Sequence, residues 1–195
     1  MKLPKSNFTG SSTIGPRNGC NLMEPMRFRH IALISIAALI ASLLIIVLVT
    51  SRPPKESKII RDFSAHRAAY EQVRTMLLGD KDVAAVADYG VENADSPISK
   101  IPPDGGMPAV RYQEYLALLK QIGASRVGRG SQPPRVAFDV WASGWGGDTR
   151  HVNICWMERE PSNTVGSLDA FYRTAKPRNP SYVHIDGHWY IWADW

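Results

Sequence analysis

The stretches RVAFDVWAS (135–143) and RHVNICWM (150–157) decide the fold, because apolar residues recur in both at every second position. Such alternation predicts β-strands, since successive side chains of a strand point to opposite faces of a sheet. The glycine-rich link 144–148 predicts a hairpin loop between them. We therefore expect two neighbouring antiparallel strands that share one apolar face.

Matching the apolar faces sets the register of this hairpin, because a slip by one residue would turn every side chain to the other face. The predicted cross-strand pairs are Val140–Val152, Phe138–Ile154, Trp141–His151, Asp139–Asn153 and Ala137–Cys155. In this register Asp139 lies diagonally opposite His151, within reach of its ring. A carboxylate that orients an imidazole beside Trp141 and Asn153 is the one polar constellation that suggests chemistry. The competing interpretation is an ordinary exposed sheet face.

The segment YVHIDGHWYIW (182–192) predicts a second hairpin, because Asp186-Gly187 suits a type I′ turn, whose two central residues have positive φ. The predicted pairs are Ile185–His188, Val183–Tyr190 and Tyr182–Ile191. Both faces then carry large apolar or aromatic side chains. We expect one face to meet the helices, and the other to be covered by residues 160–180, by a partner or by the membrane surface.

Two stretches predict helices, because their apolar residues recur at spacings close to 3.6. The first is 58–78, after which Gly79 serves as a C-terminal cap, and the second begins at Pro108 and is closed by Gly123. The stripes are Ile59, Phe63, Tyr70, Val73 and Leu77 in the first helix, and Tyr112, Tyr115, Leu116, Leu119 and Ile122 in the second. Between them, 83–91 predicts a short strand or irregular segment, and 92–107 predicts a loop.

These elements predict an α+β fold, with two main helices packed on an antiparallel sheet in one globular domain, 58–195. The layout resembles the nuclear-transport-factor-two-like cone, in which helices cover a curved sheet and a closing strand often carries a Gly-Trp-like pattern such as Gly187-His188-Trp189. The chain departs from that fold by having one long helix before the first strand. In overall plan it is also similar to single-span envelope proteins of bacteria, including secretion-channel scaffolds and membrane-tethered immunity proteins.

Residues 31–50, IALISIAALIASLLIIVLVT, predict a transmembrane helix, because the run has no charge, amide or proline. Twenty helical residues span about 30 Å, the thickness of the hydrocarbon core of a bilayer. A cleaved signal peptide and a buried helix of a soluble domain are the competing interpretations. The first is disfavoured because no Ala-x-Ala pattern follows the run. A disordered basic tail (1–30) would precede the span and a juxtamembrane linker (51–57) would follow it, with Met23 and Met26 as alternative start sites.

The charge distribution argues against nucleic-acid binding, although the whole chain carries a net charge of +5. The tail holds five Lys/Arg residues against Glu24 alone, so the remainder is nearly neutral and offers no basic face. The cations beside the span are typical headgroup anchors. The numbers of Lys/Arg residues on the two sides of the span do not clearly indicate one membrane orientation. We expect a cytoplasmic N-terminus and an extracytoplasmic, periplasmic domain, because a basic tail before a first helix is typical of a signal anchor.

No cofactor, metal or nucleotide motif is found in the sequence. His184 and His188 have a metal-like spacing, but a two-residue hairpin points them to opposite sides. The 144–147 loop joins two strands and is followed by no helix, so it predicts no phosphate site. Cys20 and Cys155 fall on opposite sides of the predicted membrane and predict no disulfide.

We therefore expect a membrane-anchored, non-catalytic protein-interaction or scaffold domain of a bacterial envelope, in contact with the lipid bilayer and an unidentified protein partner. The predicted interaction face is aromatic and polar: Trp141, Asn153, Tyr182, His184, Trp189, Tyr190 and Trp192. The alternative is an envelope hydrolase that uses Asp139 and His151. Small residues four apart in the span, Ala37 with Ala41 and Ala38 with Ser42, predict weak self-association through that helix.

Overall fold

The computed structural model describes residues 33–42, 52–100, 102, 106–131, 134–144, 149–173 and 180–194. It divides the chain into two compact units, Met1–Ile46 and Val47–Trp195, which we describe separately. The predicted tail 1–30 lies outside the described residues.

The first unit is described only over residues 33–42, which form a helix. Its large apolar side chains, among them Leu33 and Ile34, are 52–68% exposed. The Ser42 hydroxyl donates to the Ala38 carbonyl at 2.8 Å, one helical turn away. Residues 31–32 and 43–50 of the predicted span lie outside the described residues. Within the described segments, no helix combines the length and the hydropathy that crossing a bilayer requires.

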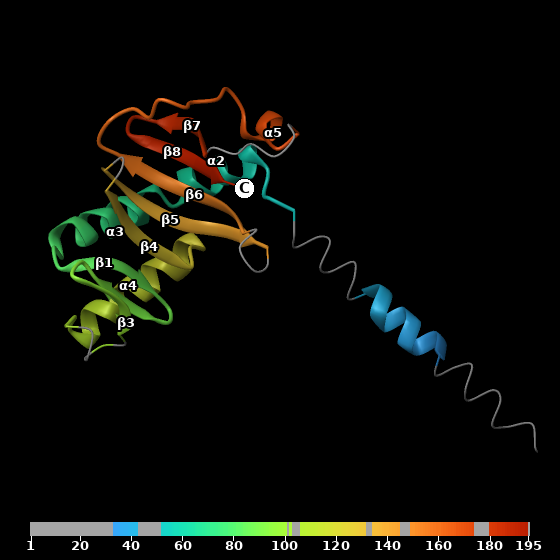
Figure 1. Cartoon of the computed structure of the whole chain (residues 1–195), viewed down its shortest axis with the longest axis horizontal. Coiled ribbons are helices and arrows are strands. Elements are labelled where there is room, and N and C mark those ends of the chain that lie inside the picture. The colour runs from blue at the N-terminus through green and yellow to red at the C-terminus, as the bar shows by residue number, and fades with distance from the viewer. Residues whose placement is uncertain are drawn as a thin grey trace, which may run out of the picture. The chain divides into compact units, whose positions relative to one another are not determined.

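The second unit is an α+β fold built on one antiparallel sheet of eight strands, in the order β3-β2-β1-β4-β5-β6-β8-β7 (Figure 1). The strands are β1 Val83–Ala87, β2 Gly90–Asn93, β3 Ser96–Lys100, β4 Arg126–Ser131, β5 Pro134–Ser143, β6 Arg150–Met157, β7 Ser181–Asp186 and β8 Trp189–Asp194. The helices are α2 Glu56–Ala65, α3 Arg67–Gly79, α4 Ala109–Ile122 and the short α5 Leu168–Phe171. The predicted fold class, helices on an antiparallel sheet, is confirmed.

The predicted helix 58–78 is two helices, because the chain breaks at His66, whose φ of −119° and ψ of 17° lie outside the α-helical region. The sequence around it contains no proline or glycine, so no local signal marks this break. The five predicted stripe residues are nevertheless all buried. The break lets both segments keep their apolar faces on the same core. The second helix is confirmed as α4, and Gly123 ends it in the left-handed conformation, with φ of 68°.

The sheet is more extensive than the sequence predicts. Residues 83–91 contain β1 and the start of β2, and β3 lies within the stretch 92–107 that predicted a loop. The strand β4 has no counterpart among the predicted elements, because its sequence RVGRGS contains one large apolar residue. That residue, Val127, is fully buried, and Arg129 donates to the carbonyls of Leu77 and Asp80 at the end of α3. Tertiary contacts of this kind specify β4 in place of an apolar pattern.

The predicted register of the β5–β6 hairpin is confirmed in one half and wrong in the other. The pairs Phe138–Ile154, Asp139–Asn153 and Ala137–Cys155 form as expected. Beyond them a β-bulge at Val140 adds one residue to β5, so that Trp141 pairs with Val152 and Ala142 with His151. A bulge shifts all later pairs by one, and the alternation of apolar residues alone does not reveal it.

The predicted register of the C-terminal hairpin is also wrong by one residue. The observed pairs are Tyr182–Trp192, Val183–Ile191, His184–Tyr190 and Asp186–Trp189, with an irregularity between His184 and Asp186. Gly187 has a φ of 56°, whereas no other residue type has positive φ in the described segments. Asp186 is therefore not a central residue of a type I′ turn, because it would need the left-handed conformation that costs a Cβ-bearing residue free energy.

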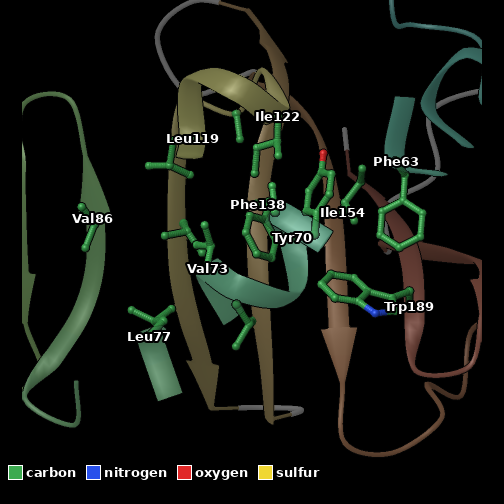
Figure 2. Close-up of a cluster of buried hydrophobic side chains, with 14 of the residues drawn as sticks. Phe63, Tyr70, Val73, Leu77, Val86, Leu119, Ile122, Phe138, Ile154 and Trp189 are labelled. Atoms are coloured by element: carbon green, nitrogen blue, oxygen red, sulfur yellow. The ribbon is translucent and has the colours of Figure 1, made fainter. Parts of the chain in front are cut away.

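The main core lies between the helices and the sheet face that they cover, which we call the helix face. Figure 2 shows Phe63 and Tyr70 of the helices packed against Phe138 and Trp189 of the sheet. Their ring centroids lie 4.9–5.9 Å apart. The indole Nε1 of Trp189 donates to Glu71 Oε1 at 2.9 Å, so the polar atom of the buried ring is satisfied. This cluster fixes α2 and α3 on the sheet.

Candidate functional site

The opposite face of the sheet, which we call the open face, carries one continuous row of polar and aromatic residues. Each member is the direct cross-strand partner of the next, so the strand register places them side by side. In the order β4, β5, β6, β8 and β7, this polar row is Arg126, Asp139, Asn153, Trp192 and Tyr182. Successive residues of a strand point to opposite faces of the sheet. The row exists because the apolar residues next to these positions along each strand point to the helix face.

A second apolar cluster lies beside the polar row on the open face. Its buried members are Cys155, Met157, Tyr182 and Tyr190, with Ala137 and Trp192 packed against them. No helical residue of the described segments belongs to it, whereas the main core draws on α2, α3 and α4. The open face therefore has an apolar floor that large side chains of the sheet itself shield from water.

Arg126 forms a charged cluster at the β4 end of the polar row. Its Nη2 lies 2.9 Å from Glu92 Oε2 and its Nε lies 3.4 Å from Glu92 Oε1, in a fork-like pair. Its Nη1 lies 3.8 Å from Asp139 Oδ2. The side chains are between 23% and 31% exposed, so water screens this cluster less than a surface pair. Burial alone would lower the pKa of Arg126, but the hydrogen bonds that it donates to Glu92 and the negative charge of that carboxylate raise the pKa above its ordinary value.

The Asp139 carboxyl sits in the middle of the row with incomplete charge compensation. Burial raises its pKa above the ordinary value, and this effect outweighs the opposing influence of Arg126, of His151 and of the Asn153 amide that hydrogen-bonds to it. Asn153 is 7% exposed, and its Oδ1 atom is buried without a hydrogen-bond partner. The centre of the row thus combines a carboxyl that resists ionisation with an unsatisfied acceptor.

Arg135 lies across the other end of the open face. Its guanidinium carbon is 5.3 Å from the ring centroid of Trp192, and its Nη1 donates to the Tyr182 hydroxyl at 3.2 Å. Arg135 takes part in none of the ion pairs of the described segments. A Cβ atom at Gly130 would lie 2.8 Å from its side chain, so the glycine gives the arginine room to lie flat. The indole Nε1 of Trp192 is buried without a partner.

The structure brings most of the predicted interaction residues together and separates two of them from the rest. On the open face lie Asn153, Tyr182, His184, Tyr190 and Trp192, together with the catalytic candidate Asp139. His184 is exposed and its ring packs against Tyr190 with centroids 5.2 Å apart. Trp189 belongs to the main core, and Trp141 packs beside that core next to the bulge.

The predicted Asp139–His151 pair does not form a direct contact in the described residues. Because of the bulge, His151 pairs with Ala142 rather than Trp141, and its second neighbour is Asp194. Asp139 instead contacts Arg126 and Asn153, and His151 influences it only through its charge. This arrangement lacks the hydrogen bond by which a carboxylate orients a catalytic imidazole.

The remaining candidate groups are engaged in local contacts. His184 Nε2 lies 3.0 Å from the Gly187 carbonyl, and His188 Nδ1 lies 3.0 Å from the Met157 carbonyl. Burial raises the pKa of the Cys155 thiol to about 12, so the nucleophilic thiolate is not populated at neutral pH. Within the segments that the structure describes, no group of His, Cys, Asp and Glu is arranged to hold a metal ion.

Three residues of the open face, Glu92, Arg126 and Arg135, were not identified from the sequence. A usable signal exists in β4, where Arg126 and Gly128 alternate with Val127, a pattern typical of a strand with one buried face. The reach of Arg135 to Tyr182 depends on strand order, which the sequence does not encode locally.

Comparison with protein-family models, curated proteins and solved structures gives no match to this chain.

Proposed function

We propose that the chain is a membrane-anchored, non-catalytic interaction domain of a bacterial envelope, which binds a protein partner through the open face. The observation that carries this proposal is the combination of an apolar cluster and a row of Arg, Trp and Tyr side chains on a sheet face without described helices. These residue types dominate the energetics of protein interfaces.

The anchor in this proposal is the transmembrane helix 31–50. Its support is that residues 33–42 are helical and expose large apolar side chains, which water solvates poorly and a bilayer accommodates. The domain then lies on the periplasmic side of the membrane. Alkaline phosphatase fused after Trp195 tests the orientation, because this reporter is active only after export. An inactive full-length fusion would place the domain in the cytoplasm.

The finer fold proposal is the cone-like layout similar to the nuclear-transport-factor-two-like proteins. Its support is that two helices, α2 and α3, precede the first strand and pack with α4 on one face of the sheet. The sequence predicted one long helix before the first strand, which departs from this layout. The structure has two helices, α2 and α3, in its place. A cone-like sheet would also curve the open face around Arg135, which contacts side chains of both β8 and β7.

The open face suits a protein interface energetically as well as by composition. Trp192 Nε1 and Asn153 Oδ1 are cross-strand neighbours that lack partners, and unsatisfied buried groups of this kind cost free energy. Side-chain or backbone amides of a partner offer both a donor and an acceptor to them. Arg135, which is stacked on Trp192, adds a cation without an ion-pair partner among the described residues. A hydrolase using Asp139 and His151 has less support, because the two side chains are not in contact.

Site-specific photocrosslinking in native membranes tests the interaction proposal. A photoreactive residue replaces His184, which is exposed on the open face, and in a matched variant replaces Val110, which is 83% exposed on α4. We expect a recurrent protein adduct at position 184 that is absent at position 110. Identical adduct patterns at both positions, or no adduct at position 184, would contradict the proposal.

A further inference from the structure

A cavity of about 230 Å³ opens on the helix side of the sheet, away from the open face. Its walls are largely apolar and come from five elements: Ile59 of α2, Tyr70 of α3, Ile122 of α4, Val140 and Trp141 of β5 and Ile154 of β6. Figure 2 shows the hydroxyl of Tyr70 between Ile122 and Ile154. Burial raises the pKa of this hydroxyl, so it remains protonated and neutral at any physiological pH.

The bulge in β5 builds one wall of this cavity. In a regular strand, consecutive residues point to opposite faces, so only one of Val140 and Trp141 would face the helices. The extra residue places both beside the main core and in the lining of the cavity. Bulges are typical of positions where a strand re-aims side chains next to a site. Gly123, which ends α4 with a φ of 68°, adds no side chain to the space.

Apart from the Tyr70 hydroxyl, the polar side-chain groups that line the cavity lie at its rim. Lys58 Nζ and Asp62 Oδ2 lie 2.6 Å apart, and these side chains are 60% and 43% exposed. The hydrogen bond from Lys58 holds the pKa of Asp62 below its ordinary value, so both groups are charged. The cavity therefore has an apolar interior and a charged mouth, which is the chemistry that recognises an amphiphile.

The mouth is close along the chain to the predicted bilayer. Pro54, which also lines the cavity, follows Thr50, the last residue of the proposed span, by four residues. Along the chain, the cavity therefore follows directly after the proposed anchor, and such an anchor favours ligands that partition into a bilayer.

We infer that this cavity binds a single-chain fatty acid, with the acyl chain inside and the carboxyl group at the Lys58–Asp62 mouth, where the Lys58 ammonium can donate to it and the Asp62 carboxylate can accept from its protonated form. This inference rests on the proposed membrane anchor. An apolar cavity of about 150 Å³ holds a benzene molecule, so the present volume accommodates several methylene groups. It is smaller than the pockets that enclose larger ligands, which favours one short acyl chain over the two chains of a phospholipid.

Photolabelling of the full chain in phospholipid nanodiscs tests this inference. The probe is a medium-chain fatty acid with a terminal diazirine, and mass spectrometry maps its adducts. We expect adducts on Ile122, Val140 or Trp141 that an excess of the unlabelled fatty acid suppresses and an excess of diacyl phospholipid does not. Adducts confined to residues 31–50 would overturn the inference and leave the anchor intact, whereas adducts in neither region would overturn both.

A pair of variants separates filling of the cavity from a general change in the protein. V140F places a larger side chain in the cavity wall, and the matched control V110F makes the same change on the exposed surface of α4. We expect V140F to reduce labelling of Ile122 and Trp141 at least about tenfold, which corresponds to a loss of about 1.4 kcal/mol of binding free energy. Labelling of 31–50 should be the same in both variants. If V140F does not fold, competition by the unlabelled fatty acid on the unmodified chain decides the question, and unsuppressed cavity labelling would contradict the inference.

Discussion

The two faces of the same sheet differ in how they are kept from water. The helix face is closed by α2, α3 and α4, and its aromatic rings fill a continuous core. The open face buries a smaller apolar cluster beneath the long side chains of the sheet itself. It also leaves charged groups partly exposed at the β4 end of the polar row. The two tryptophans of β8 illustrate the difference: Trp189 donates to Glu71 within the core, whereas Trp192 has a buried donor without a partner. One face is organised for stability, and the other retains unsatisfied groups that a partner can engage.

Removal of the Trp189 side chain should have the largest effect on the free energy of unfolding, and it tests the contrast between the two faces. W189A removes a ring that is 1% exposed and contacts three other aromatic rings, so we expect a loss of about 3–5 kcal/mol in the free energy of unfolding. The matched variant W192A removes a half-buried ring of the same strand. We expect it to cost about 1–2 kcal/mol, because part of its surface is already in water. Urea unfolding measures both, and equal losses would contradict the division into two faces.

A smaller effect is expected from the charged cluster of β4. R126M leaves Glu92 half-buried without its forked partner, so we expect a loss of about 1–2 kcal/mol in unfolding free energy. The double variant E92Q/R126M should lose less than the sum of the single variants, because the uncompensated carboxylate is removed too. Additive losses in a double-mutant cycle would show that the pair contributes nothing.

The loss of Arg135 should affect binding more than stability. R135M keeps an unbranched apolar side chain over Trp192 but removes the charge and the hydrogen bond to Tyr182. We expect a change in unfolding free energy of at most about 1 kcal/mol. We also expect a clear loss of the adduct at position 184 in native membranes. An undiminished adduct would remove Arg135 from the interface.

The smallest expected effect is the pH dependence due to Asp139. Its folded-state pKa is raised above the ordinary value of 3.8, so the folded protein binds more protons at this site than the unfolded chain between the two values. Stability from this group therefore falls as the pH rises through that interval and is lowest at neutral pH. D139N, which does not titrate, should gain stability relative to the unmodified protein on going from about pH 3 to pH 7. A difference in unfolding free energy that is independent of pH would contradict the raised pKa.

The parts of the fold that sequence predicts are those where a single pattern dominates. The apolar stripe of α4 with Gly123 and the alternation in β5 and β6 are of this kind, and all three elements form as expected. The break at His66, the bulge at Val140 and the one-residue shift near Asp186 are not predictable in this way. Each is a local irregularity that tertiary packing selects: no proline or glycine adjoins His66 or Val140, and Gly187 indicates a turn after Asp186 without fixing its register.

The candidate site, like the fold, could be predicted from the sequence only where a single hairpin pattern determines it. The neighbours Asp139 and Asn153 follow from the first hairpin, because their pairing precedes the bulge. Arg126 and Arg135 require the pairing of β4 with β5, and β4 has too few apolar residues to be recognised from periodicity. Arg126 and Arg135, which lie at the two ends of the open face, are therefore placed only when the strand order is known.

The most direct test of the central claim compares W192A with the unmodified chain by photocrosslinking from position 184 in native membranes, at a temperature where both remain folded. If the open face is the binding surface, W192A loses the recurrent adduct while its unfolding transition stays cooperative. An adduct of unchanged yield from a folded W192A protein would show that the partner binds elsewhere.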